Sequence, residues 1–138
     1  MHIMIEDLQG NSASVNPEAL IRLRPSYGQH EPSNANFVDF ATGGIFSREQ
    51  LNELVEKFSH HLPLAMLHSP VGTPVFLNVN AIAAIVNPDP TRHHENAHAV
   101  AIVKPAYINP LNPGRKEQQL SEDVTKASAV LRNTKVRV

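Results

Sequence analysis

The sequence predicts an α+β protein with mainly antiparallel strands, built from two tandem strand-rich repeats that are each closed by one amphipathic helix. Three observations lead to this prediction. The apolar pattern repeats at one constant offset, which places Met4 on Met66 and Gly10 on Gly72. Within each copy, apolar and polar residues alternate as they do in half-buried strands. Near the end of each copy the apolar spacing becomes helical.

The repeat divides the chain of 138 residues into repeat 1, residues 1–62, and repeat 2, residues 63–138. A unit of about 60 residues buries little core by itself. We therefore expect the two copies to pack as a pseudo-twofold pair, with each helix covering an apolar face, in one compact globular unit.

The elements of repeat 1 follow from local patterns. Strands are expected at residues 2–8, 13–15, 20–24, 37–40 and 45–46, separated by turns rich in Gly, Asn and Pro and by the polar loop 25–36. Ser47 followed by Gln50 matches a capping box. Because apolar residues then recur at helical spacing, a helix is expected over residues 48–59.

Repeat 2 follows the same order with one difference. Strands are expected at residues 64–68, 75–77, 81–86 and 97–103, with a polar loop at 87–96. Residues 104–119 contain three prolines and are expected to form a long loop, and a helix follows at 121–132. The basic tail 132–138 is expected to be an edge strand or an ordered arm.

Repeat 1 contains a turn at Gln9 and Gly10, a Val15-Asn16-Pro17 segment, and a Ser47-Arg48-Glu49 stretch before the expected helix. In these features it resembles the small flagellar FlbD-like family and related short bacterial and phage proteins. Repeat 2 keeps Gly72, Asn78 and the 121–123 stretch, but Val79 replaces the proline. The resemblance implies a small β-rich module without known catalytic residues, which acts by binding.

The composition excludes several classes of protein. The absence of cysteine excludes disulfides, thiolate zinc sites and cysteine nucleophiles, and it favours the cytoplasm of a bacterium or a phage-infected bacterium. No apolar window is long enough for a membrane span, and no secretory signal is visible. Aromatic residues make up only 5%, so a base-stacking surface for nucleic acid is not expected.

The charge is divided unequally between the repeats. Repeat 1 carries a formal net charge of −4 and repeat 2 carries +3, which together give the net charge of −1. Either the two repeats have differently charged surfaces, or opposite fields draw copies of the chain together. We expect a homo-oligomer.

One string of residues has the spacing of a zinc hydrolase. His94 and His98 flank Glu95 in the H-E-x-x-H pattern, which on a helix places both imidazoles on one face and lets the glutamate polarise a metal-bound water. The repeat offset instead places this string at the entry to a strand, where the two histidines lie too far apart for one metal ion. The leading prediction is therefore that the chain has no cofactor and no catalytic residue. In the alternative, His94 and His98 bind zinc and Glu95 is the catalytic residue.

The remaining candidates are binding residues. Arg22 and Arg24 alternate on one expected strand and suit an anion or an acidic partner, as do Arg115 and Lys116, and His98 lies in a histidine-rich loop. We expect a non-enzymatic binding or regulatory protein that acts on a protein partner or a small anionic ligand through its loops, which span residues 25–36, 87–98 and 104–119. A first alternative is a phage or mobile-element inhibitor of host defence that captures a nucleotide-like ligand or blocks a protein complex. The second is the zinc peptidase.

Overall fold

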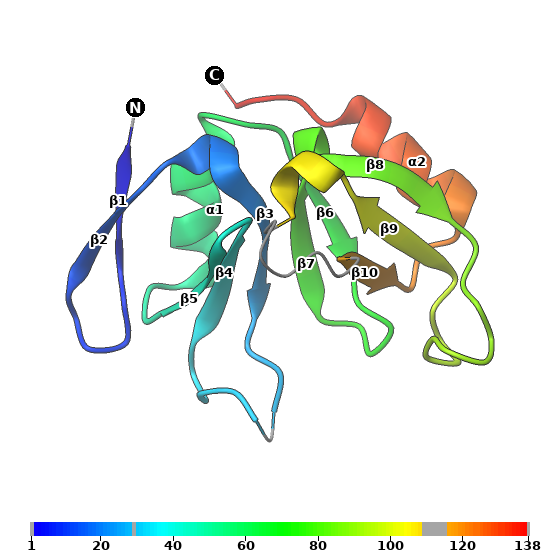
Figure 1. Ribbon diagram of the computed structural model, residues 1–138, viewed down its shortest axis with the longest axis horizontal. Helices are drawn as coiled ribbons and strands as arrows, with labels where there is room; N and C mark the ends of the chain where they lie inside the picture. The colour runs from blue at the N-terminus through cyan, green and yellow to red at the C-terminus, as the bar shows by residue number, and fades with distance from the viewer. Residues whose placement is uncertain (1, 29, 109–115, 138) are drawn as a thin grey trace.

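A computed structural model describes residues 2–28, 30–108 and 116–137, and has an α+β fold with mostly antiparallel sheets and two helices (Figure 1). Residues 1–62 form β1 (Ile3–Glu6), β2 (Ser12–Val15), the 3-10 turn η1 (Pro17–Ala19), β3 (Leu20–Pro25), β4 (Asn36–Phe40), β5 (Gly43–Ser47) and α1 (Leu51–Ser59). Residues 63–137 form β6 (Leu64–His68), β7 (Pro74–Asn78), η2 (Val79–Ala81), β8 (Ile82–Val86), β9 (Ala99–Val103), η3 (Pro105–Tyr107), β10 (Glu117–Leu120) and α2 (Val124–Asn133).

In the part of the chain that the structure describes, the strands form three antiparallel sheets. Their orders are β1-β2, β10-β9-β8 and β5-β4-β3-β7-β6. The largest sheet joins the two halves, because Arg22 on β3 lies opposite Leu77 on β7, and Leu23 lies opposite Phe76. The predicted pseudo-twofold packing is not confirmed. A twofold axis relating the halves would also pair β2 with β8, and these strands belong to separate sheets.

The halves nevertheless share local details. The turns η1 and η2 begin at Pro17 and Val79, which the repeat offset aligns. In each turn an asparagine side chain caps the start: Asn16 Oδ1 accepts from the Glu18 N–H at 3.1 Å, and Asn78 Oδ1 accepts from the Asn80 N–H at 3.0 Å. The strand that follows has a register shift at its second residue in both halves, in β3 against β4 and in β8 against β9.

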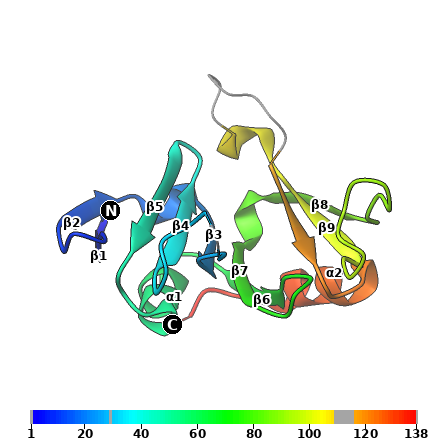
Figure 2. The ribbon, with the colours of Figure 1, turned by 90° about the horizontal axis from the view of Figure 1, so that it is seen from below.

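Each helix covers one apolar cluster. Leu54 and Phe58 on α1 are fully buried in the first cluster, and Ala127 and Leu131 on α2 pack in the second. The spacing of four residues places each pair on one face of its helix. Both helices lie on the same side of the sheets, whereas η3 projects from the opposite side (Figure 2).

Both helices begin about three residues later than predicted. Ser47 is the last residue of β5, where its hydroxyl donates to the Glu6 carbonyl at 2.6 Å and accepts from the Glu49 N–H at 3.0 Å. The predicted capping box is therefore wrong, because Ser47 still belongs to β5 and α1 begins only after Gln50, which provides no side-chain cap. In α2 the capping residue is Asp123, whose Oδ1 accepts from the Lys126 N–H at 2.8 Å.

The segment 104–119 is not simply a loop. It begins with η3 and ends in β10, which pairs with β9, and residues 109–115 lie outside the described residues. The tail after α2 is an arm without strand pairing over residues 134–137, and the Arg137 N–H donates to the Ser59 carbonyl at 2.8 Å. Arg137 also forms an ion pair with Glu56.

Neither α1 nor α2, the two helices of the described residues, is long and apolar enough to cross a membrane.

A glutamate just before each helix holds the first strand of its half. The Glu6 N–H donates to Glu49 Oε2 at 2.8 Å, and the His68 N–H donates to Glu122 Oε1 at 3.0 Å. The Glu122 carboxylate also bonds the His68 ring at 2.8 Å. Burial alone would raise the pKa of Glu122, but the hydrogen bonds from the His68 ring and N–H outweigh it and hold this pKa below the usual 4.5.

The lowered pKa of Glu122 predicts a loss of stability in acid. A carboxylate with a lowered folded-state pKa stabilises the fold above its unfolded value, and this contribution disappears as the pH falls through the folded-state pKa. The loss therefore occurs below pH 4.5. In urea unfolding at a series of pH values, the difference between wild type and Glu122→Gln should shrink as the solution is acidified. Glu95→Gln, at an exposed turn position, is the control. If the free energies of unfolding of the wild type and Glu122→Gln differ by the same amount at every pH, this account is contradicted.

Candidate binding site at the junction of the halves

Two of the predicted binding residues, Arg22 and Lys116, meet on one carboxylate. Arg22 Nε donates to Asp39 Oδ2 at 2.9 Å, and Lys116 Nζ donates to Asp39 Oδ1 at 3.3 Å. Arg22 Nη1 reaches into the other half and donates to Gln118 Oε1 at 2.7 Å and to the Glu117 carbonyl at 3.1 Å. We call these five residues, which come from β3, β4, β10 and the residue before β10, the junction cluster.

The fold explains why these residues converge. Arg22 and Asp39 are direct cross-strand partners on β3 and β4, and such pairs bring side chains of opposite charge together. Lys116 immediately precedes β10, and its ammonium also lies 3.5 Å from the Phe40 carbonyl. The junction cluster therefore links the two halves by side chains, in addition to the β3–β7 pairing.

The junction cluster has more positive than negative charge facing solvent. Asp39 is nearly inaccessible, with 3% of its side chain exposed, whereas 18% of Arg22 and 31% of Lys116 are exposed. Two cations thus share one buried carboxylate. Within the described residues Arg22 Nη2 has no hydrogen-bond partner. The Glu117 carboxylate is engaged by Arg92 at 3.1 Å and by the His93 ring at 2.8 Å.

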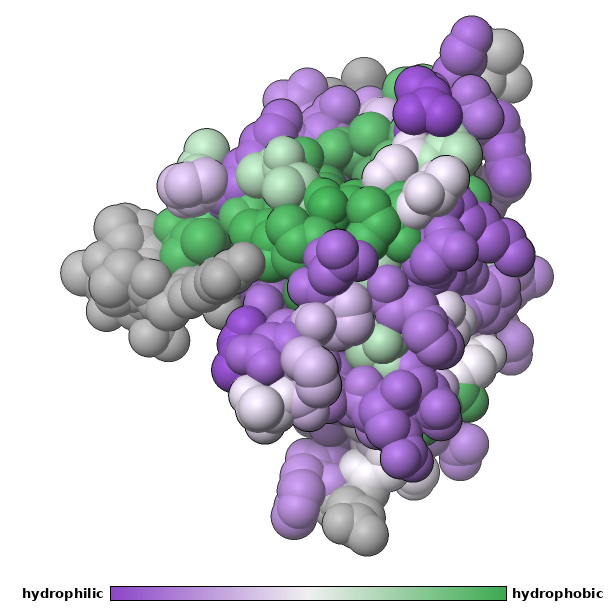
Figure 3. All heavy atoms as spheres, turned by 90° about the vertical axis from the view of Figure 1, so that its right-hand side faces the viewer, coloured by the Kyte–Doolittle hydropathy of each residue, from purple (hydrophilic) through white to green (hydrophobic). Residues whose placement is uncertain are grey.

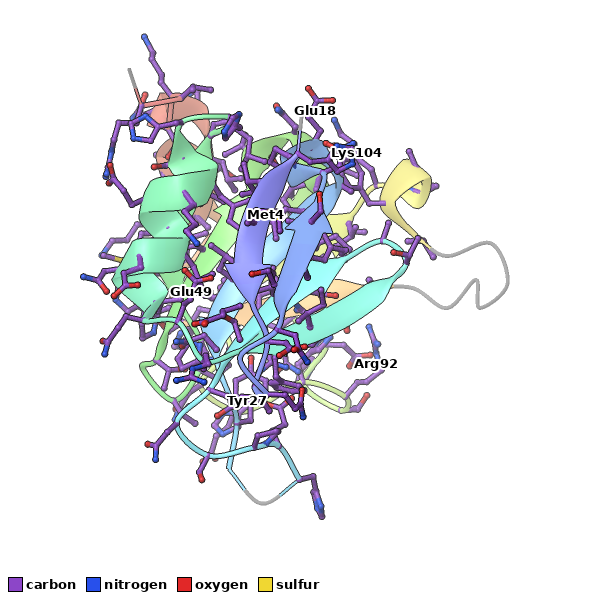
Figure 4. The ribbon with its side chains drawn as sticks, turned by 90° about the vertical axis from the view of Figure 1, so that its left-hand side faces the viewer. Met4, Glu18, Tyr27, Glu49, Arg92 and Lys104 are labelled. Atoms are coloured by element: carbon purple, nitrogen blue, oxygen red, sulfur yellow. The ribbon has the colours of Figure 1, made fainter. Side chains whose placement is uncertain are left out.

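Further cations lie on the same side of the molecule. Figure 4 shows Arg92 and Lys104 on the side from which η3 projects. Lys104 is exposed, and its backbone N–H anchors the segment to the Ala81 carbonyl at 2.8 Å. Arg115, another predicted binding residue, lies outside the described residues.

Arg24 is engaged inside the protein. Its Nη1 and Nη2 donate to the two carboxylate oxygens of Glu31, each at 2.9 Å, and its guanidinium lies 3.7 Å from the centroid of the Tyr27 ring and 4.7 Å from that of Phe37. The hydrogen bonds from Arg24 lower the pKa of Glu31, although burial opposes the shift. Because bidentate pairing and ring stacking use both the edge and the face of the guanidinium, Arg24 holds the 25–36 loop.

The zinc-hydrolase geometry is absent from the H-E-x-x-H string. Residues 94–98 form a turn and an extended segment, in which the Ala97 N–H donates to the His94 carbonyl at 3.0 Å. His94 Nδ1 accepts from the Asn96 N–H at 3.0 Å, and His98 Nδ1 bonds the Ser121 carbonyl at 2.9 Å. No helix places the two imidazoles on one face. Among the residues with described coordinates, no three His, Asp or Glu side chains are grouped to hold a metal ion.

The sequence-based prediction lacks two features of this region. The first is the buried Asp39, for which a lone acid within the aromatic strand Phe37–Phe40, opposite an arginine-bearing strand, is a usable signal. The second is an open groove of about 920 Å3 between α1 and β7, lined by Leu51, Val55 and Phe76. This groove forms only because β7 from the second half lies beside the first half, so no local pattern could indicate it.

The fold and the junction cluster place the chain among small α+β proteins with mostly antiparallel sheets. No family model matches it, and neither curated proteins nor solved structures include a match.

Proposed function

We propose that the chain is a non-enzymatic binding protein built on a duplicated β-rich scaffold, with residues 1–62 and 63–138 as the two copies. The matching asparagine-capped turns, register shifts and carboxylate contacts support the duplication, because unrelated halves would have no reason to share all three. Self-association is part of this proposal.

The ligand that we propose is a small anion of the phosphate or nucleotide class. The observation that carries this proposal is the convergence of Arg22 and Lys116 on the single carboxylate of Asp39. A buried carboxylate keeps the two cations close together in the absence of ligand, and it neutralises only one of them. A phosphate group offers several acceptor oxygens, which suit an arginine fork and a lysine ammonium together.

Lys116→Gln tests this ligand. We expect inorganic phosphate, a nucleoside diphosphate or a cyclic nucleotide to raise the melting temperature of the wild type above that in sodium chloride of equal ionic strength. The variant should bind at least about tenfold more weakly, since a hydrogen bond to a charged group contributes about 1.5–3 kcal/mol. Lys126→Gln is the matched control, because Lys126 is an exposed lysine on α2.

Two results would overturn the anion proposal. One is that none of the tested anions stabilises the wild type beyond the salt control. The other is that Lys116→Gln and Lys126→Gln respond equally, which would indicate general screening of charge.

The biological setting stays a prediction. A cytoplasmic location, the FlbD-like resemblance and a role in phage or mobile-element inhibition of defence fit a small ligand-capturing protein. The blocking of a protein complex is the outcome to pursue if the anion test fails.

A further inference from the structure

Strand β8 has an apolar edge that no strand among the described residues covers. Its five residues are Ile-Ala-Ala-Ile-Val, and it is the outer strand of the β10-β9-β8 sheet. Ala83 and Ala84 are exposed, and Ile82, Ile85 and Val86 are half-buried. Figure 3 shows an apolar strip across the side of the molecule formed by β8 and α2. Exposed edges in natural proteins are usually protected by charge, proline or a cover, so an uncharged apolar edge indicates a strand-pairing surface.

A strand pair inside the chain indicates what covers this edge. In element order β3 is the counterpart of β8, and the edge of β3 is covered by β7. Under that cover Ile21 is 1% exposed, whereas its counterpart Ala83 is exposed. The counterpart of β7 is β2, which is likewise an outer strand, in the two-stranded β1-β2 sheet. The two free edges are thus counterparts of the two edges that pair within the chain.

We propose that copies of this chain associate head to tail, with β8 of one molecule pairing antiparallel with β2 of the next. The internal pairs Arg22–Leu77 and Leu23–Phe76 fix the register. Shifted by the repeat offset, they place Ala84 opposite Val15 of the second copy and Ile85 opposite Ser14. This register rests on the duplication proposed above.

An asparagine supports the same pairing. Asn78, which is 1% exposed, donates from Nδ2 to the Leu20 carbonyl at 2.8 Å across the internal β3–β7 junction. Its counterpart Asn16 caps η1 in the same way, yet Asn16 is exposed and its Nδ2 has no partner within the described residues. In the proposed assembly Asn16 would donate to the carbonyl of Ile82, which is the counterpart of Leu20.

The free edges lie at opposite ends of the molecule, as Figure 1 shows for the β1-β2 hairpin and β8. An open groove borders each edge, of about 400 Å3 beside β2 and about 290 Å3 beside β8. The β2 end belongs to the half with net charge −4 and the β8 end to the half with +3, so opposite charges meet at the contact. Because the contact joins two different surfaces, each added molecule presents a free edge for the next one. The assembly therefore grows into a filament or closes into a ring.

Cysteine pairing tests the register directly, because the chain contains no cysteine. Paired residues on antiparallel strands are close enough for a disulfide. After oxidation, a mixture of the single variants Ser14→Cys and Ile85→Cys should give a disulfide-linked dimer on a non-reducing gel, and neither variant alone should do so. Met4→Cys replaces Ser14→Cys in the matched control, because Met4 is the cross-strand partner of Ser14 on β1 and therefore lies one strand further from the β2 edge. It should not cross-link with Ile85→Cys.

A second variant keeps the proposal testable if a cysteine variant does not fold. Light scattering should give the wild type a mass of at least two chains, which decreases as salt is added. Ala83→Lys places a charge on the edge and should give a monomer, whereas Ala106→Lys, at an exposed position on η3, should keep the wild-type mass. A monomeric wild type, or cross-linking of one variant with itself in place of the mixture, would overturn the proposal. Anion binding, measured at Lys116, is read separately from assembly, so the failure of one proposal is distinguishable from the failure of the other.

Discussion

Replacing Asp39 with alanine is expected to lower the free energy of unfolding by about 3 kcal/mol or more, because breaking a buried ion pair leaves the other charge without compensation. Asp39 is 3% exposed at its side chain and holds both Arg22 and Lys116. The effect should appear in urea unfolding as a lower midpoint with an unchanged slope. Asp39→Asn keeps the shape and an acceptor oxygen, and should lose less.

An exposed pair provides the control for Asp39. Arg48 and Glu6 lie 3.7 Å apart with 57% and 45% of their side chains exposed, so Arg48→Ala should cost no more than about 1 kcal/mol. If Asp39→Ala and Arg48→Ala lose equal stability, the junction cluster does not hold the halves together.

Replacing Phe58 with alanine is expected to cost about 3–5 kcal/mol, through lost burial and the cavity that remains. Phe58 is fully buried, and its ring centroid lies 6.2 Å from that of Phe40. Because whole domains are stable by only about 5–15 kcal/mol, this single change can unfold much of the protein at ambient temperature.

Two further variants make the Phe58 result interpretable. Phe58→Leu keeps most of the apolar volume and should lose less, which gives a folded protein for comparison. Met66→Ala, at a side chain that is half exposed, should change stability by no more than about 0.5 kcal/mol. Equal losses in Phe58→Ala and Met66→Ala would show that α1 does not cover the core as described.

The side-chain pairing of the candidate site was only partly readable from the sequence. Alternation placed Arg22 and Arg24 on one strand, but it could not say that the first would meet Asp39 and Lys116 while the second would be held by Glu31. Those outcomes depend on which carboxylate reaches each guanidinium, and Lys116 lies far from Arg22 along the chain. The H-E-x-x-H string failed as a zinc motif for a related reason, since its spacing has meaning only on a helix.

By itself, the sequence determined most of the strands, the Gly- and Asn-bearing turns and the apolar faces of both helices, because these depend on backbone sterics and on residues a few positions apart. It did not indicate β10, which begins inside the segment that was expected to be a loop. Only the tertiary structure decided that β3 pairs with β7 and that Ser47 ends a strand instead of starting a helix. It also decided that no described strand covers the outer edges of β2 and β8. The physical reason is that a backbone hydrogen bond between strands carries no sequence signature of its own. Which strand pairs with which therefore depends on the edges that the packing of the two halves brings together.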